Sequence, residues 1–323
     1  MKLVMGIDGI RIGHVTDVEH ATGCTVILCP DGAVCGVDIR GGASGVYGTD
    51  TAGMLHLVPR IHAVVLTGGS AFGLETVFGV MQWLEEQNVG FDVGITKVPI
   101  VCGAVIFDLS VGAHDVRPNR EWGYQACKST STGKDVLKQG TVGAGTGATV
   151  GKVMGMDCAM KGGLGVASVE LPNDVLVTAI AVVNAWGDVI DWRTGQIAAG
   201  VYDRQRKQFL NAVKLVKRSA GIGFKTSAQV ENTTIATVIT NARLAKWQAT
   251  KLAQFAQNGI ALAVRPAHTM FDGDTAFALS IGDKPADLNA LGIATQEAIA
   301  TAILNAVTHS ESIHNIPTAN DVV

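Results

Sequence analysis

The stretch ENTTIATVITNA, residues 231–242, marks an abrupt change from loop to strand in this 323-residue chain. From Thr234 onward it is rich in β-branched and small residues, which is the composition of a buried strand. The preceding stretch GIGFKTSAQVEN, residues 221–232, has the Gly, Ser, Gln and Lys content of an exposed loop. We therefore predict that Thr233 and Thr234 begin a core strand.

A hydroxyl residue at this junction has the chemistry needed for self-cleavage. Attack of the Thr233 Oγ1 on the carbonyl of Asn232 would give an ester, and hydrolysis of that ester would free the α-amine of Thr233. This amine has a pKa near neutrality and is a competent general base for the neighbouring hydroxyl. Asn-Thr-Thr at a strand start is also an ordinary turn sequence, so these residues alone leave both interpretations open.

Elsewhere the pattern predicts runs of strands with long helices between them. The predicted strands are residues 24–29, 33–39, 62–68, 260–264 and 275–281, with a Pro-Asp-Gly hairpin at 30–32 and several short strands in 140–183. The predicted helices are residues 70–87, capped by Ser70, and 198–218, 242–257 and 295–308. This order favours sheets covered by helices. Because no long polar linker divides the chain, we predict one domain over residues 1–323.

Composition narrows the class of protein. With 47% hydrophobic and 16% charged residues, the chain is predicted to be globular. A net charge of −3 without a dense Lys/Arg cluster argues against nucleic acid or an anionic membrane as a partner. Without a signal-like start or an 18-residue apolar run, a cytoplasmic location is expected. Six cysteines without Cys-x-x-Cys spacing or a His cluster indicate reduced thiols and no metal site.

Seven ordered blocks resemble the P1-type peptidases, the self-processing family of the DmpA aminopeptidase/D-esterase and the β-peptidyl aminopeptidases. The first is NTTIATVITNARLAK, residues 232–246. The others are RGGASGVYGTD (40–50), LTGGSAFGL (66–74), VPIVCGAVIFDL (98–109), GAGTGATVGK with KGGLGVAS (143–168), VVNAWGD (182–188) and HTMFDGDTAFAL (268–279). The resemblance implies an α+β fold, a four-layer αββα sandwich. It also implies cleavage at Asn232-Thr233 into fragments 1–232 and 233–323, with Thr233 as nucleophile, and a homo-oligomer, a tetramer of processed units.

The same resemblance assigns polar residues to the site. Asn184, which by itself is also a common turn former, is expected beside the nucleophile as an oxyanion donor. Asp272 and Asp274 stand where characterised relatives carry Ser and Glu. We expect Asp272 to hydrogen-bond the Thr233 hydroxyl and Asp274 to orient the Thr233 amine or accept its proton, whereas from the sequence alone they fit a β-turn that binds a cation.

Adjacent strand residues point to opposite faces, so only Thr233 or Thr234 can face the Asp272/Asp274 pair, and the chemistry selects Thr233.

Gly68 and Gly69 form a turn before the predicted helix at Ser70. Free N–H groups there would hold a substrate carbonyl or carboxylate.

GAGTGA, residues 143–148, fits a relaxed dinucleotide pattern but lacks a clear preceding strand and an acidic partner, so no cofactor is expected.

Together these features predict a self-processing amidohydrolase. It would remove N-terminal residues from short peptides, amides or esters through a Thr233 acyl-enzyme. Two alternatives remain open at this stage. One is acyl transfer of the ornithine acetyltransferase kind, which also uses a Thr nucleophile after self-cleavage. The other is a non-catalytic binding module with the same sandwich.

Overall fold

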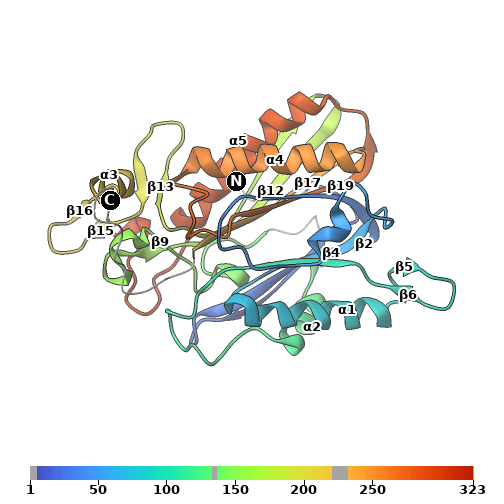
Figure 1. Cartoon of the computed structure of the whole chain (residues 1–323), viewed down its shortest axis with the longest axis horizontal. Helices are drawn as coiled ribbons and strands as arrows, with labels where there is room; N and C mark the ends of the chain where they lie inside the picture. The colour runs from blue at the N-terminus through green and yellow to red at the C-terminus, as the bar shows by residue number, and fades with distance from the viewer. Residues whose placement is uncertain (1–5, 133–136, 220–231, 323) are drawn as a thin grey trace.

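The 18-residue strand β2, Thr22–Ile39, passes from one layer of the structure into another. The computed structural model describes residues 6–132, 137–219 and 232–322 (Figure 1). The first half of β2 pairs with β1 (Arg11–Asp17) and β4 (Ile61–Thr67), and the second half pairs with β19 (Thr275–Lys284). The predicted hairpin at 30–32 is wrong, because the chain continues through it as a register shift within one strand.

Two sheets thus meet at β2. The first sheet adds β7 (Val101–Val105), β3 (Val46–Tyr47) and β8 (Ser131–Thr132). The second sheet follows the order β2, β19, β17 (Thr233–Ala242), β12 (Val175–Asn184) and β11 (Gly163–Leu171). Two strands from residues 233–323, β17 and β19, therefore lie between strands from the earlier part of the chain. A cut before Thr233 would leave both fragments in one fold.

Apolar side chains on alternate strand positions build the layers. Ile27 and Leu66 of the first sheet share a buried cluster with Ile235 and Phe277 of the second. The outer face of the first sheet packs on α1 (Thr76–Glu86) and α2 (Arg120–Lys128), and that of the second packs on α4 (Lys246–Ala263) and α5 (Leu288–Thr308). Figure 1 shows these helix pairs on opposite sides of the strands. The predicted four-layer αββα sandwich is confirmed.

Glycine lets the helices approach the second sheet closely. A Cβ on Gly165 of β11 would collide with the carbonyl oxygen of Ala302 in α5, and one on Gly36 of β2 would collide with the backbone of α4 at Thr250. Part of the glycine content of the chain therefore serves helix-on-sheet packing.

Three predicted elements differ from the structure. The predicted helix 198–218 is mostly extended, and only its end is helical. It comprises β14 (Ile197–Ala199), β15 (Tyr202–Asp203), β16 (Gln208–Phe209) and α3 (Ala212–Arg218). The predicted strand 260–264 is mostly the end of α4, because Gly259 and its apolar neighbours pack on Ile299 of α5. Ser70 is not a helix N-cap: it has a φ of 54° inside the 3-10 helix η2 (Ser70–Glu75), which Gly69 caps.

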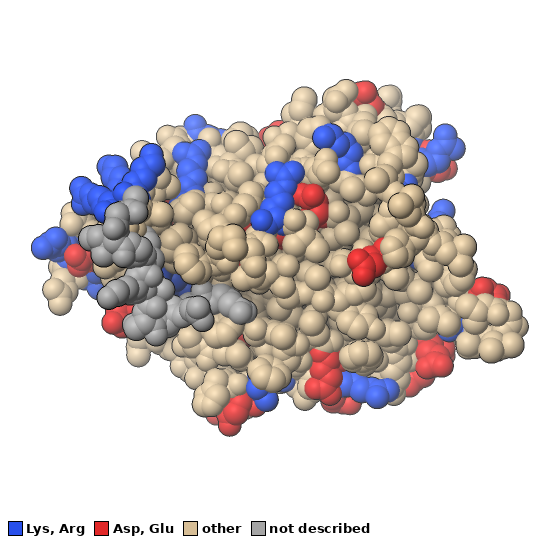
Figure 2. Space-filling model, viewed as in Figure 1, with Lys and Arg blue, Asp and Glu red and all other residues tan. Residues whose placement is uncertain are grey.

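The remaining elements are short. The strands are β5 (Phe91–Asp92), β6 (Lys97–Val98), β9 (Thr149–Val150), β10 (Met160–Lys161), β13 (Asp188–Ile190) and β18 (Val264–Arg265). The 3-10 helices are η1 (Thr49–Ala52), η3 (Gly143–Gly145), η4 (Lys152–Met154), η5 (Met156–Cys158), η6 (Pro172–Asp174) and η7 (Ala319–Asp321). Of the described helices, α5 alone is long and apolar enough to cross a membrane, but most of it is buried in the sandwich. On the face shown in Figure 2, charged side chains of both signs lie on a largely uncharged surface.

Candidate active site

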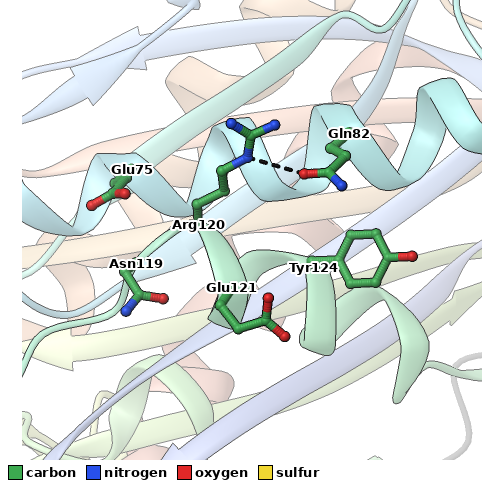
Figure 3. A pocket seen from close by; sticks show the side chains of 6 residues that line it. All are labelled: Glu75, Gln82, Asn119, Arg120, Glu121 and Tyr124. Carbon is green, nitrogen blue, oxygen red and sulfur yellow. Dashed lines mark hydrogen bonds between the residues drawn. The ribbon is translucent and has the colours of Figure 1, made fainter.

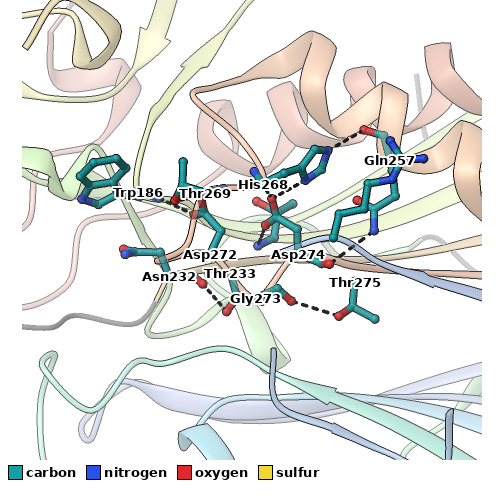
Figure 4. A network of polar contacts seen from close by, with 12 residues as sticks. Trp186, Asn232, Thr233, Gln257, His268, Thr269, Asp272, Gly273, Asp274 and Thr275 are labelled. Carbon is teal, nitrogen blue, oxygen red and sulfur yellow. Dashed lines mark hydrogen bonds and ion pairs between the residues drawn. The ribbon is translucent and has the colours of Figure 1, made fainter. Parts of the chain in front are cut away.

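Three of the predicted blocks meet at one edge of the second sheet. Because β12 is antiparallel to β17, the end of β12 lies beside the start of β17, and Asn184 is paired directly with Thr233. Because β19 is parallel to β17, the segment before β19 lies at the same edge, where Asn232 bridges to Asp272. The sheet topology thus brings together residues about 40 to 90 positions apart in the sequence (Figure 4).

The carbonyl group of Asn232 receives two short hydrogen bonds. The Thr233 hydroxyl donates to it at 2.5 Å, and the backbone N–H of Gly273 donates to it at 2.6 Å. Gly273 also leaves room for the hydroxyl, since a Cβ at this position would lie 2.8 Å from the Thr233 Oγ1. The bond at which self-cleavage was predicted therefore has a hydroxyl next to its carbonyl and an N–H group bonded to its oxygen.

The two threonines face opposite sides of the sheet, but not as predicted. Pairing of Ile235 with Thr275 in the parallel ladder makes Thr234 level with Asp274 and Thr233 level with Gly273. Thr233 shares its face with Ile235, which belongs to the cluster between the two sheets. The prediction that Thr233 faces the Asp272/Asp274 pair is wrong, because strand register gives that face to Thr234.

Asp274 is held by backbone and histidine donors. It accepts a bond from the Thr234 N–H at 2.7 Å, and from the N–H and Nδ1 of His268 at 2.9 Å each. Burial lowers the pKa of His268, but its hydrogen bond to Asp274 and the charge of that carboxylate together raise the pKa above its ordinary value. This geometry favours a carboxylate–imidazolium pair, with Asp274 bonded to the backbone nitrogen of Thr234 instead of Thr233.

Asp272 is also bonded away from the Thr233 hydroxyl. Its carboxylate accepts bonds from the N–H of Thr269 at 3.0 Å and from the Thr269 hydroxyl at 2.5 Å. The single hydroxyl hydrogen of Thr233 is donated to Asn232, so the predicted bond between Asp272 and this hydroxyl is not formed in the described chain. Burial, and next the charge of Asp274, raise the pKa of Asp272 to about 6.

The amide of Asn184 is fixed at both ends. Its Oδ1 accepts bonds from the Thr149 N–H at 3.0 Å and from the Lys152 Nζ at 2.8 Å, while its Nδ2 donates to the Phe107 carbonyl at 2.9 Å. Since an ammonium group only donates, Lys152 settles which end of the amide is oxygen. The side chain is fully buried on the same face as Thr233, so it is as rigidly held as an oxyanion donor must be.

Lys152 belongs to this site, although no sequence pattern pointed to it. Its Nζ donates to both the carbonyl and the side-chain oxygen of Asn184. Burial lowers the pKa of Lys152 to about 7, while the negative charges of Asp272 and Asp108 act in the opposite direction. In the sequence it is a single Lys in a Gly-rich run, and only the fold shows that it is buried beside Asn184.

The predicted anion site at Gly68, Gly69 and Ser70 is not available. The Gly68 N–H donates to the Gly23 carbonyl at 2.9 Å, and the Ser70 N–H donates to the Ile106 carbonyl at 3.0 Å. The Gly69 N–H donates to the Asp108 carboxylate at 2.7 Å. The prediction assumed free donors at a helix start, but this turn packs into the protein and its donors are satisfied there.

Aromatic side chains lie near the start of β17. The rings of Trp186 and Phe271 lie 5.1 Å apart, and the Phe271 carbonyl accepts a bond from the Asn232 N–H at 2.8 Å. Met270, beside Phe271, is 77% exposed. These side chains give the edge near Thr233 an apolar wall suited to the carbon chain of a substrate.

A second, polar groove on the protein surface lies away from Thr233. It lies between α1 and α2 and is lined by Glu75, Gln82, Asn119, Arg120, Glu121 and Tyr124 (Figure 3). Its Arg120 Nε already donates to the Gln82 side chain at 3.0 Å. The groove is on the helix-covered side of the first sheet, whereas Thr233 faces the space between the sheets.

Within the described residues, no group of three His, Cys, Asp or Glu side chains is arranged to hold a metal ion.

Comparison with solved structures agrees with this architecture. The L-aminopeptidase D-Ala-esterase/amidase of Ochrobactrum anthropi, described as a variant of the Ntn hydrolase fold, has a TM-score of 0.71 and 18% identity, over 98% of this chain and 88% of its own. A β-aminopeptidase of Burkholderia sp. has a TM-score of 0.67 and 20% identity, over 98% and 89% of the two chains.

Sequence relatives extend the comparison to activity. An uncharacterized aminopeptidase of Mycobacterium leprae is 39% identical, over 98% of this chain and 93% of its own length. A 6-aminohexanoate-oligomer endohydrolase of Kocuria sp. is 33% identical, over 84% and 73%. The model of Peptidase family S58 matches residues 3–319. With this match along almost the whole chain and these relatives, the protein belongs to peptidase family S58 and is a hydrolase.

Proposed function

We propose that the protein cleaves its own chain between Asn232 and Thr233 and then hydrolyses amide bonds with Thr233 as an N-terminal nucleophile. The observation that carries this proposal is the pair of hydrogen bonds on the Asn232 carbonyl, from the Thr233 hydroxyl at 2.5 Å and the Gly273 N–H at 2.6 Å. The first keeps the nucleophile beside its target. The second stabilises the negative charge that develops on the carbonyl oxygen during attack.

The self-cleavage step needs a base, and we assign that role to Lys152. Its amine, held on the cross-strand partner of Thr233, has a pKa lowered to about 7 and is partly neutral at physiological pH. The Thr233 Oγ1 bonds to the Asn232 carbonyl carbon and its proton passes to Lys152, which returns it to the departing nitrogen as the peptide C–N bond breaks. Water then hydrolyses the ester, leaving a carboxyl group on Asn232 and a free amine on Thr233.

The same groups would act in turnover. The freed α-amine of Thr233, with a pKa near 8, takes the hydroxyl proton as the oxygen attacks the substrate carbonyl. Asn184 and Lys152 supply donors on the face of Thr233 where the substrate oxyanion would form. The leaving amine takes the proton, and water hydrolyses the Thr233 ester to release the acid.

For substrate, we propose release of N-terminal residues from short peptides or amides, supported by the aminopeptidase names of relatives at 38–39% identity. A second candidate is internal cleavage of linear amide oligomers. It is favoured by the endohydrolases at 33% identity and by the described carboxylates nearest Thr233, which are already hydrogen-bonded to protein groups instead of open to a substrate ammonium. Acyl transfer to an amine would use the same acyl-enzyme and differs only in what attacks it.

Self-cleavage is tested by substituting each of the two adjacent threonines in turn. Thr233→Ala should remain one chain and be inactive, while Thr233→Ser should still cleave because it keeps a hydroxyl nucleophile. Thr234→Val is a matched control: the buried Thr234 hydroxyl has no hydrogen-bond partner among the described residues, so its loss should leave processing and activity intact. Intact mass and N-terminal sequencing decide, and a fragment beginning anywhere but Thr233 contradicts the proposal.

The base is tested by the pH dependence of processing. For precursor made by cell-free translation, the cleavage rate should rise from about pH 6 and level off above about pH 7–8, because the neutral fraction of Lys152 rises through its pKa of about 7. Lys152→Met should slow cleavage by about 100-fold or more and remove this rise. A rate in the variant that keeps the wild-type pH profile would assign the base elsewhere.

The role of Asn184 is tested with an asparagine of the neighbouring strand as control. Asn184→Ala should lower kcat by roughly 100- to 1000-fold, about 2.7–4 kcal/mol, with little change in KM, measured per processed molecule. Asn241, at the far end of β17, likewise bonds backbone groups at both ends of its amide, at 2.8 and 2.9 Å. Asn241→Ala should lower stability and leave kcat unchanged. Turnover of Asn184→Ala within about threefold of wild type would return Asn184 to a structural role.

The two substrate proposals differ in their need for a free amine. If the protein is an aminopeptidase, N-acetylation of an aminoacyl p-nitroanilide should lower kcat/KM by about 100-fold or more, about 2.7 kcal/mol. Equal rates on free and acetylated forms, together with internal cuts in a linear 6-aminohexanoate oligomer shown by mass spectrometry, would instead establish the second candidate. Adding a free amine as acceptor and measuring the aminolysis product tests acyl transfer in the same assay.

A further inference from the structure

Two further charged residues, Asp108 and Lys161, are buried near the segments that hold Asn184. Asp108 is 2% exposed and Lys161 is fully buried. Each shifts the titration of the other: the charge of Lys161 lowers the pKa of Asp108, and the charge of Asp108 raises that of Lys161, in both cases against a larger opposite effect of burial. Neither residue has a role in the reaction proposed above, and charged side chains are almost never fully buried unless they are paired.

Asp108 fixes the segment that holds the nitrogen end of Asn184. Its two carboxylate oxygens accept bonds from the Gly69 N–H at 2.7 Å and from the Thr22 hydroxyl at 2.8 Å. These bonds tie Asp108 to the end of β4 and the start of β2. Phe107, the preceding residue, presents the carbonyl that receives the Asn184 Nδ2 at 2.9 Å. The position of that carbonyl therefore depends on the anchoring of Asp108.

Lys161 fixes the segment that holds the oxygen end of Asn184. Its ammonium donates to three backbone carbonyls, those of Gly145, Ala148 and Gly162, at 3.0, 3.0 and 3.2 Å. Two of these belong to the turn that leads directly into Thr149. The N–H of Thr149 then donates to the Asn184 Oδ1 at 3.0 Å.

The two segments also touch each other. A Cβ on Gly147 would lie 2.7 Å from the Cβ of Asp108, so the turn held by Lys161 packs directly on Asp108. Three carbonyls around one ammonium, in a site without water access, hold a loop more firmly than apolar packing alone, because each hydrogen bond has a preferred direction. The arrangement fixes the Gly-rich loop of residues 143–148 inside the sandwich.

We propose that Asp108 and Lys161 are positioning residues for hydrolysis: acting as a pair, they hold Phe107 and Thr149, the two backbone positions that orient the side-chain amide of Asn184 toward Thr233. The inference rests on the proposed function, since it assigns to these residues an effect on turnover that passes through Asn184. It adds two residues that do not touch the reacting atoms and to which the sequence blocks quoted above assigned no role.

A double-mutant cycle tests whether the effect passes through Asn184. Lys161→Met keeps a long side chain and removes the donors. We expect it to lower kcat at least tenfold per processed molecule, with KM changed less than threefold. In an Asn184→Ala background the same substitution should change kcat less than twofold, because the amide it positions is gone. Fully multiplicative effects of the two substitutions on kcat would overturn the proposal.

A matched control separates positioning from stability. Lys246, in the first turn of α4 and at the far end of β17 from Thr233, also donates to three backbone carbonyls, those of Thr51, Gly53 and His56. Lys246→Met should lower the melting temperature and leave kcat unchanged. An equal loss of kcat in Lys246→Met and Lys161→Met would mean that loss of stability alone explains the effect, which also overturns the proposal.

Asp108→Asn provides a second route if Lys161→Met does not fold. It keeps the shape of the side chain but removes its charge, and we expect the same fall in kcat and the same lack of effect in the Asn184→Ala background. Wild-type turnover by Asp108→Asn would refute the inference. A wild-type protein that neither processes nor hydrolyses amides would refute the proposed function instead, so the two failures are distinguishable.

Discussion

The antiparallel pairing of Asn184 with Thr233 is the constraint on which the site depends. It brings the end of β12 and the start of β17 to one sheet edge and sets both side chains on the face between the two sheets. There the amide cannot turn away, since Thr149 and Lys152 hold its oxygen and Phe107 holds its nitrogen. Asn184 and Thr233 are both buried in this corner, and burial strengthens the polar contacts there.

Burial of four charged groups gives this corner its electrostatic character. Burial raises the pKa of Asp108 and of Asp272 to about 6, and lowers the pKa of Lys152 and of Lys161 to about 7. The pKa values of these carboxyl and amino groups differ widely in water, and burial brings them close to each other near neutral pH. Groups with similar pKa values exchange protons at a low free-energy cost. Such groups add little net stability, because desolvation offsets their attraction, so a functional reason for their presence is the stronger explanation.

The resemblance implied the four layers, and the predictions failed where tertiary contacts decide. β-Branched and small residues predicted β17, residues 275–281 were predicted as the strand that is β19, and the blocks around Asn184 and Asp272 pointed to one site. Strand register was not readable, so Thr233 was placed on the wrong face. Lys152 and Lys161 were missed because a lysine in a Gly-rich run gives no sign of burial, and the Gly68–Ser70 donors were judged free because their acceptors, such as Asp108, lie far away in the sequence.

Register also explains which contacts Asp272 and Asp274 make in this fold. Asp274 bonds the Thr234 nitrogen and His268, and Asp272 bonds Thr269, so both carboxylates hold the backbone around Thr233 and neither bonds its hydroxyl. A different side chain at either position would therefore change the charge near Lys152 and the hydrogen bonds that support the start of β17. It would leave in place the two hydrogen bonds on the Asn232 carbonyl, because one comes from the Thr233 hydroxyl and the other from the backbone of Gly273.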